Sequence, residues 1–369
     1  MNVMDYLDWR GDLSFDVSPF NEVDNFILSQ VVNLDYSGLI PEDGTPVPFS
    51  SVINAYYEKY GEDGNYTGLI MAKQSWPMVR KLVRTRRFET MRASAYENIV
   101  VDDINEQFSA ITLTVPGQFT YIAYKGTDDT IAGWKEDCCM AFMDRIEARE
   151  DAVRYLMDTA GRVTEPLILG GHSKGGNLAV YAAAKAPYAV KKRILHVYSN
   201  DGPGFDESFF KTEDYMLIRS RVTLIMPKCS IIGAIFEQDC EQVIVECGKQ
   251  GIMAHNGFTW EVLGTQFVRA GALVKSSRAF RLGMHRALNG LTKQQKREFT
   301  DSMFDSLTVT GARTITDLTK LKPREALEIG HMLRDRREIL IVFSRIFQES
   351  VHEYREEQKV QPDAGSQDL

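Results

Sequence analysis

The stretch LILGGHSKGGN at residues 167–177 decides how this chain folds. It opens with an apolar run typical of a buried strand, and the alanine-rich residues that follow, 175–186, predict a helix. Between them, residues 171–175 match the pattern G-x-S-x-G with Ser173 at its centre. Glycines allow a sharp strand-to-helix turn that exposes the serine oxygen at the end of a sheet. The bare pattern is weak, but this context makes Ser173 a candidate nucleophile; the alternative is a glycine-rich turn with a solvent-exposed serine.

Short strands and helices alternate on both sides of this turn. Residues 110–115 and 120–124 predict a hairpin, because Pro-Gly-Gln separates two β-rich runs, and residues 144–160 carry a helical stripe. Further short apolar strands are predicted at residues 194–199, 222–226 and 243–247. Such alternation indicates parallel βαβ units. We therefore expect residues 95–275 to form a three-layer α/β domain, a sandwich with a mostly parallel sheet.

The N-terminal residues 1–94 are predicted to be an extension packed on this core. They are rich in turn formers and acids at first, with a helix expected at residues 24–34. Residues 71–94 are basic and carry Arg87 among other cations. We expect that basic run to be a solvated face.

The C-terminal part of the chain is predicted to be helical. Residues 260–274 have an amphipathic pattern, a helix is expected to begin at Thr292, and residues 323–350 carry another long helical pattern. We expect residues 276–352 to form a helical cap, lid or appendage. The polar residues 353–369 are predicted to be a disordered tail.

Composition sets the class of protein. The 369 residues are 44% hydrophobic and 25% charged, which suits a soluble globular chain. The net charge of −8 argues against a general nucleic-acid binder, because phosphate contacts need a basic surface. No apolar run is long enough to span a membrane, and the N-terminus lacks the features of a signal peptide. A cytoplasmic protein is expected, and peripheral membrane contact stays compatible with the sequence.

The five cysteines carry no C-x-x-C pair, so zinc-ribbon and thioredoxin interpretations have no support. We expect reduced, mostly buried thiols in a reducing compartment.

A serine nucleophile needs a base and an orienting acid, and in this type of fold they follow it in the order acid, histidine. His255 is the candidate base, because it lies in a glycine-containing loop after the last predicted strand. Asp201 is the first candidate acid, since it ends the strand at residues 194–199. Glu237 and Asp239 are alternatives, and a site without an acid is a third possibility.

The oxyanion of an acyl-transfer reaction needs two backbone N–H donors. One is expected from Lys174, the residue after the nucleophile. The other is expected from Thr127, in the loop that follows the strand at residues 120–124. An ordinary strand exit is the alternative for that loop.

These motifs resemble a known group of enzymes. Residues 124–127 (YKGT), followed by Trp134 and Asp137, resemble the oxyanion segment of fungal-type (class 3) lipases, and residues 171–176 resemble their nucleophile turn. Two departures stand out. Lys174 replaces a usually apolar residue, so that its charge either favours an anionic substrate group or points into solvent. The strand at residues 222–226 is not followed by the acid found in those lipases.

The sequence is more closely similar to the bacterial Mbeg-like family of α/β-hydrolases. The matching segments are residues 6–15, 19–24, 170–179 and 230–233, together with His255 and Trp260. The resemblance implies the α/β-hydrolase fold and a hydrolase role, and it supplies no substrate.

Two functions follow as hypotheses. The first is a serine hydrolase of the lipase or esterase type, in which Ser173 attacks an ester carbonyl, His255 takes its proton and Asp201 orients the imidazole. Its substrate would be a small-molecule or lipid ester, and it needs neither cofactor nor metal. The second is a catalytically weak α/β-hydrolase scaffold that acts as a binding protein, motivated by the uncertain acid and by Lys174.

Overall fold

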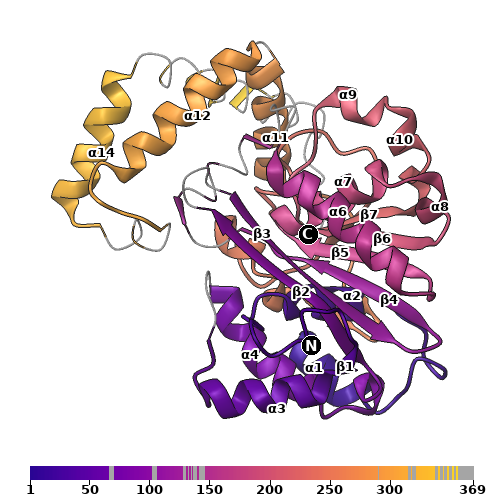
Figure 1. The fold of residues 1–369 in the computed structure, drawn as a ribbon. Coiled ribbons are helices and arrows are strands. Elements are labelled where there is room, and N and C mark those ends of the chain that lie inside the picture. The colour runs from indigo at the N-terminus through magenta and orange to yellow at the C-terminus, as the bar shows by residue number, and fades with distance from the viewer. Residues whose placement is uncertain are drawn as a thin grey trace, which may run out of the picture.

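The computed structural model places most of the chain around one eight-stranded sheet (Figure 1). The residues that it describes are 1–65, 70–101, 106–127, 130, 131, 133, 135, 139, 140, 146–289, 291–314, 317, 321–336, 340, 344, 347, 348, 351, 352 and 355. Trp134, Asp137 and every residue of the predicted tail 353–369 except Arg355 lie outside them, so the tail prediction stays a prediction.

The strands follow one another across the sheet in chain order, from β1 to β8. The first three pairs are antiparallel and the four pairs from β4 to β8 are parallel, so the fold is α/β with a mostly parallel sheet. The strands are β1 (Val47–Pro48), β2 (Arg92–Val101), β3 (Glu106–Val115), β4 (Phe119–Tyr124), β5 (Leu167–His172), β6 (Ile194–Asn200), β7 (Val222–Pro227) and β8 (Glu241–Val245). The predicted hairpin is confirmed as β3–β4, with Gly117 at φ 75° in its turn.

Successive side chains along the strands pack into two separate hydrophobic cores, one on each face of the sheet. On β4, Tyr121 and Ala123 join the core on one face, whereas Ile122 and Tyr124 join the core on the other. Strands buried on both faces in this way are expected for a parallel sheet covered by helices. The second face is covered by α6 (Glu147–Arg162) and α7 (Lys174–Lys185), with α8 (Tyr188–Lys191), α9 (Glu207–Phe210) and α10 (Glu213–Met216) beside them (Figure 1).

The N-terminal helices cover the first face and share its core. They are α1 (Val3–Arg10), α2 (Glu22–Val31), α3 (Phe49–Tyr60) and α4 (Ile70–Leu82). An ion pair between two fully buried side chains connects α2 to the segment after α4. Arg87 Nη2 lies 2.5 Å from Asp24 Oδ2. The same guanidinium donates to the carbonyls of Leu13, Ser18 and Pro19. The prediction of a wholly solvated basic face is therefore wrong at Arg87, whose buried side chain links Asp24 to these carbonyls.

The C-terminal helices lie at the other end of the molecule from α3 and α4 (Figure 1). They are α11 (Lys275–Asn289), α12 (Lys293–Thr308) and α14 (Pro323–Asp335). The predicted helix start at Thr292 is confirmed, since its side chain and that of Gln295 form a reciprocal capping box. Ile131 packs with Phe304 and Ala312, which attaches α12 to the segment after β4.

The helix predicted at residues 260–274 is wrong. The chain instead forms a small hairpin of β9 (Val262–Leu263) and β10 (Gln266–Phe267). Gly264 takes φ 64° in the connection, a conformation that favours glycine and reverses the chain. Val262 is buried and Leu263 is exposed, so the apolar pattern here has the two-residue period of a strand.

Candidate active site

Ser173 occupies a strained turn between β5 and α7. Its φ of 57° and ψ of −130° are sparsely populated by residues other than glycine. A side chain at Gly171 would come within 2.2 Å of the Gly175 carbonyl carbon, and one at Gly175 within 2.1 Å of the Tyr124 carbonyl oxygen. The glycines of the motif are thus required by close backbone approach, and the strand–turn–helix context predicted from the sequence is present.

Neighbouring strands tie this turn to Asp201. The Ser173 amide donates to the Asn200 carbonyl at 2.9 Å, at the end of β6. The next residue, Asp201, donates its amide to Ile225 of β7 at 2.7 Å and has a φ of 49°. Serine and carboxylate therefore lie at the carboxyl ends of adjacent parallel strands, which is where α/β sheets place ligands and active sites.

His255 and Asp201 form a buried hydrogen-bonded pair. The distance from His255 Nδ1 to Asp201 Oδ2 is 2.6 Å, and both side chains are almost wholly shielded from solvent. A neutral imidazole that donates from Nδ1 keeps its lone pair on Nε2. The pair thus has the tautomer that a general base requires.

The second carboxylate oxygen of Asp201 is also fully engaged. Its Oδ1 accepts from the Ser230 hydroxyl at 2.5 Å and from the Gly233 amide at 3.1 Å. Three donors on one buried carboxylate fix its orientation.

The other carboxylates considered as acids have different partners. Glu237 pairs with His285, and Asp239 pairs with Arg219 at 2.6 Å. The structure therefore joins Asp201 to His255 and places the two alternatives elsewhere.

His172 links the nucleophile turn to the histidine loop. Its Nε2 donates to the His255 carbonyl at 2.9 Å, and the two ring centroids are 4.3 Å apart. Since a carbonyl oxygen only accepts, the proton of the neutral ring is on Nε2. Burial and the neighbouring His255 hold the pKa of His172 well below its usual range, so the ring stays neutral.

Thr127 and Lys174 flank the same turn. A side chain on Gly126 would lie 2.6 Å from the His172 carbonyl and 3.4 Å from Ser173 Cβ, so the loop that carries Thr127 passes directly beside Ser173. Lys174 opens α7, where backbone N–H groups point toward the N-terminal end of the helix. Its side chain is buried and donates from Nζ to the Gln107 carbonyl at 2.9 Å, so the suggestion that it points into solvent is wrong.

The candidate nucleophile and the candidate base are linked through His172, which precedes Ser173 and contacts the His255 carbonyl. Within the described residues, the Ser173 hydroxyl makes no hydrogen bond to the imidazole. Catalytic hydrogen bonds are often long in unliganded sites and tighten when substrate binds.

Sequence reasoning missed His172 and Ser230 as parts of this site. A side chain next to the nucleophile cannot fold back onto it, so the sequence offers no reason to place His172 in the site; in the structure it contacts the backbone of the candidate base His255. Ser230 lies in the segment 230–233 that carried the family resemblance, which was a usable signal.

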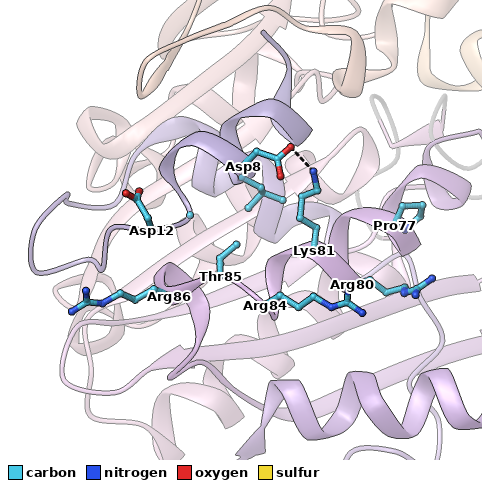
Figure 2. A pocket seen from close by; sticks show the side chains of 10 residues that line it. Asp8, Asp12, Pro77, Arg80, Lys81, Arg84, Thr85 and Arg86 are labelled. Atoms are coloured by element: carbon cyan, nitrogen blue, oxygen red, sulfur yellow. Dashed lines mark hydrogen bonds and ion pairs between the residues drawn. The ribbon is translucent and has the colours of Figure 1, made fainter.

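A basic groove lies away from this site, between α1 and α4 (Figure 2). Its cavity of about 600 Å³ is lined by Arg80, Lys81, Arg84 and Arg86, and Lys81 is paired with Asp8 at 2.6 Å. Figure 2 shows Arg86 extending to the opposite side from Arg80. Arg86 thus lies apart from Arg80 and Arg84, so the three guanidinium groups do not build a single anion site.

Two absences hold for the described part of the chain. None of its helices is long and apolar enough to cross a membrane. No group of three or more histidine, cysteine or acidic side chains there is placed to hold a metal ion.

The fold and the site together define an α/β protein with a buried histidine–carboxylate pair beside a serine at a strand-to-helix turn. The chain belongs to the Mbeg1-like family, whose model matches residues 82–305, and this confirms the resemblance over that range. A comparison with curated proteins finds no match. Among solved structures, M37 lipase aligns at 16% identity and a TM-score of 0.31, covering 50% of this chain and 67% of the lipase chain. A TM-score this low does not establish a shared fold.

Proposed function

We propose that this protein is an α/β-hydrolase that cleaves a carboxylic ester through an acyl-enzyme on Ser173. One observation carries the proposal: the buried 2.6 Å hydrogen bond from His255 to Asp201, tied through His172 to the turn that bears Ser173. A serine hydroxyl is a poor nucleophile by itself, and an oriented imidazole beside it is what activates it.

The reaction runs in two halves. In the first, Ser173 Oγ attacks the ester carbonyl while His255 Nε2 takes its proton, and the leaving alcohol departs with that proton. In the second, water attacks the acyl-enzyme, again with His255 as base, and the acid product leaves. Asp201 holds the imidazole and stabilises its charged form throughout. The amides of Lys174 and Thr127 are our proposed donors to the oxyanion.

The substrate class we propose is a small-molecule or lipid ester. Residues 276–352 are proposed as a helical cap, because α12 is attached through Ile131 and Lys135 to the segment that follows the oxyanion loop. We propose a reducing, cytoplasmic setting, in which Cys229, Cys240 and Cys247 are thiols as the structure has them.

The first test is labelling with a fluorophosphonate probe, which reports an activated serine without knowledge of the substrate. Wild type should label, and Ser173→Ala should not, while retaining its thermal unfolding midpoint. Ser208→Ala is the matched control, since Ser208 is exposed on α9 and should label as wild type does. His255→Ala should lower the labelling rate by about 100-fold or more, the usual contribution of a general base.

Absence of labelling in a folded wild-type protein would contradict the proposal and favour a binding role for the same scaffold. If labelling occurs, esters graded by acyl length would then define the substrate.

A further inference from the structure

Two cysteines lie side by side at the edge of the site. β7 and β8 pair in parallel with Pro227 opposite Val245, and Cys229 and Cys247 each follow by two residues. Their sulfurs are 3.4 Å apart, and each thiol donates to the Lys249 carbonyl at 3.1 Å. Neighbouring parallel strands thus present both thiols on one side, as a cross-strand pair.

A cavity gives small molecules access to this pair. It has a volume of about 530 Å³, and both cysteines line it together with Lys228, Lys249 and Phe280. Cys229 and Cys247 are each only 8% exposed, so they form the buried floor of this cavity. A cavity of this volume is in the range that holds small ligands, so a low-molecular-weight disulfide is the reagent of matching size.

We propose that Cys229 and Cys247 are a reversible dithiol–disulfide site whose oxidation state controls the geometry of Asp201 and His255. The oxidant is a low-molecular-weight disulfide. The catalytic consequence rests on the proposed function, whereas the disulfide itself does not.

The chemistry balances as two exchange steps. One cysteine, as its thiolate, attacks a sulfur of the small disulfide, forms a mixed disulfide and releases one small thiol. The other cysteine then attacks the protein sulfur of that mixed disulfide, forms the Cys229–Cys247 bond and releases the second small thiol. The protein loses two electrons and two protons, and the small disulfide gains both.

The two cysteines are directly connected to the groups that hold the candidate acid and base. Cys229 precedes Ser230, whose hydroxyl donates to Asp201. Cys247 begins the loop that leads into the short helix Gly251–His255. A disulfide requires sulfurs about 2.05 Å apart, so the pair must close by more than ~1 Å. Oxidation also removes both donors to the Lys249 carbonyl, and each change shifts a segment that orients the Asp201–His255 pair.

Oxidation of the pair should be slow. Burial and the neighbouring sulfur raise the pKa of the Cys229 thiol to about 12, so Cys229 is protonated at neutral pH. Because the thiolate is the attacking species, long equilibration is needed.

The test equilibrates the whole chain in buffers of graded ratios of 2-mercaptoethanol to its disulfide, 2-hydroxyethyl disulfide. Acid quenching, alkylation and peptide mass analysis then count the thiols. We expect a reversible link between the peptides that carry Cys229 and Cys247. Cys240→Ser is the matched control, since Cys240 precedes the opposite end of β8 and should leave the link unchanged. Cys229→Ser should abolish it.

Coupling to the site is followed by two independent signals. The low-field NMR resonance of the His255 Nδ1 proton should shift on oxidation, and fluorophosphonate labelling of Ser173 should slow by about tenfold or more and recover on reduction. Neither change should occur in Cys229→Ser.

Absence of the link in the folded wild type, or a link without movement of the histidine resonance, would overturn the inference. If neither redox state reacts with the fluorophosphonate probe, the hydrolase proposal fails. The mass analysis and the NMR signal then still decide whether Cys229 and Cys247 form a disulfide coupled to His255.

Discussion

At the scale of single residues, the site is held by side chains that do not themselves react. His172 donates to the backbone of the candidate base, and Ser230 donates to the candidate acid. Each contact joins two segments that are far apart in the sequence. This is why His255 and Asp201 could be proposed from their places after strands, whereas their supporting residues could not: the partners are set by tertiary packing.

His172 should give the protein a specific pH dependence. The pKa of His172 in the folded protein lies below its ordinary value of 6.5. Below that pH the imidazole is therefore protonated in the unfolded chain and neutral in the folded one. The free energy of unfolding should therefore fall as the pH drops below about 6.5, by up to about 1.4 kcal/mol per pH unit from this residue. His172→Gln places an amide donor where Nε2 lies but cannot titrate, so its slope should be shallower.

The measurement is urea unfolding of both proteins between about pH 5 and pH 8. Near pH 8 the two free energies should be similar, because the hydrogen bond to the His255 carbonyl is kept. Equal slopes below pH 6.5 would show that His172 does not carry the effect.

At the scale of elements, the contact between β5, α7 and β4 determines where Ser173 lies. Gly175 on α7 leaves no room for a methyl group against the Tyr124 carbonyl of β4. The pattern of residues 171–175 predicted this turn because the close approach of Gly171 to Gly175 is local. By contrast, the hairpin at Val262–Phe267 was mistaken for a helix, since short apolar segments can satisfy either period until the buried face is known.

Gly175→Ala should therefore disrupt the turn. We expect a loss of about 1–3 kcal/mol or more in the free energy of unfolding, because backbone atoms must move to accept the new methyl group. Labelling of Ser173 should fall with it. Gly161→Ala is the control: Gly161 lies on α6 with nothing within 4 Å of an added methyl group, so alanine should be neutral or stabilising. Equal stability of the two variants would contradict the close approach.

At the scale of the whole molecule, the N-terminal helices are part of the sheet's own core. Side chains from α1 to α4 share one cluster with Ile111, Ile168 and Val243 of the strands. Composition alone predicted an extension packed on a core, but it gave no sign that one face of the sheet depends on these helices. The mostly parallel sheet was predictable because strand–helix alternation is visible in the sequence; the attachment of the helices is long-range and was not.

The buried pair of Arg87 and Asp24 tests this dependence. Arg87→Met leaves the carboxylate of Asp24 buried without its cation, which should cost about 3–5 kcal/mol in urea unfolding. Arg86→Met is the matched control, because the adjacent Arg86 is exposed and its loss should change stability by less than about 0.5 kcal/mol. If the helices and the sheet form one cooperative unit, Arg87→Met will shift a single transition seen equally by tryptophan fluorescence and circular dichroism. Two separated transitions, or a loss no larger than that of Arg86→Met, would mean that the N-terminal helices pack on the sheet without sustaining it.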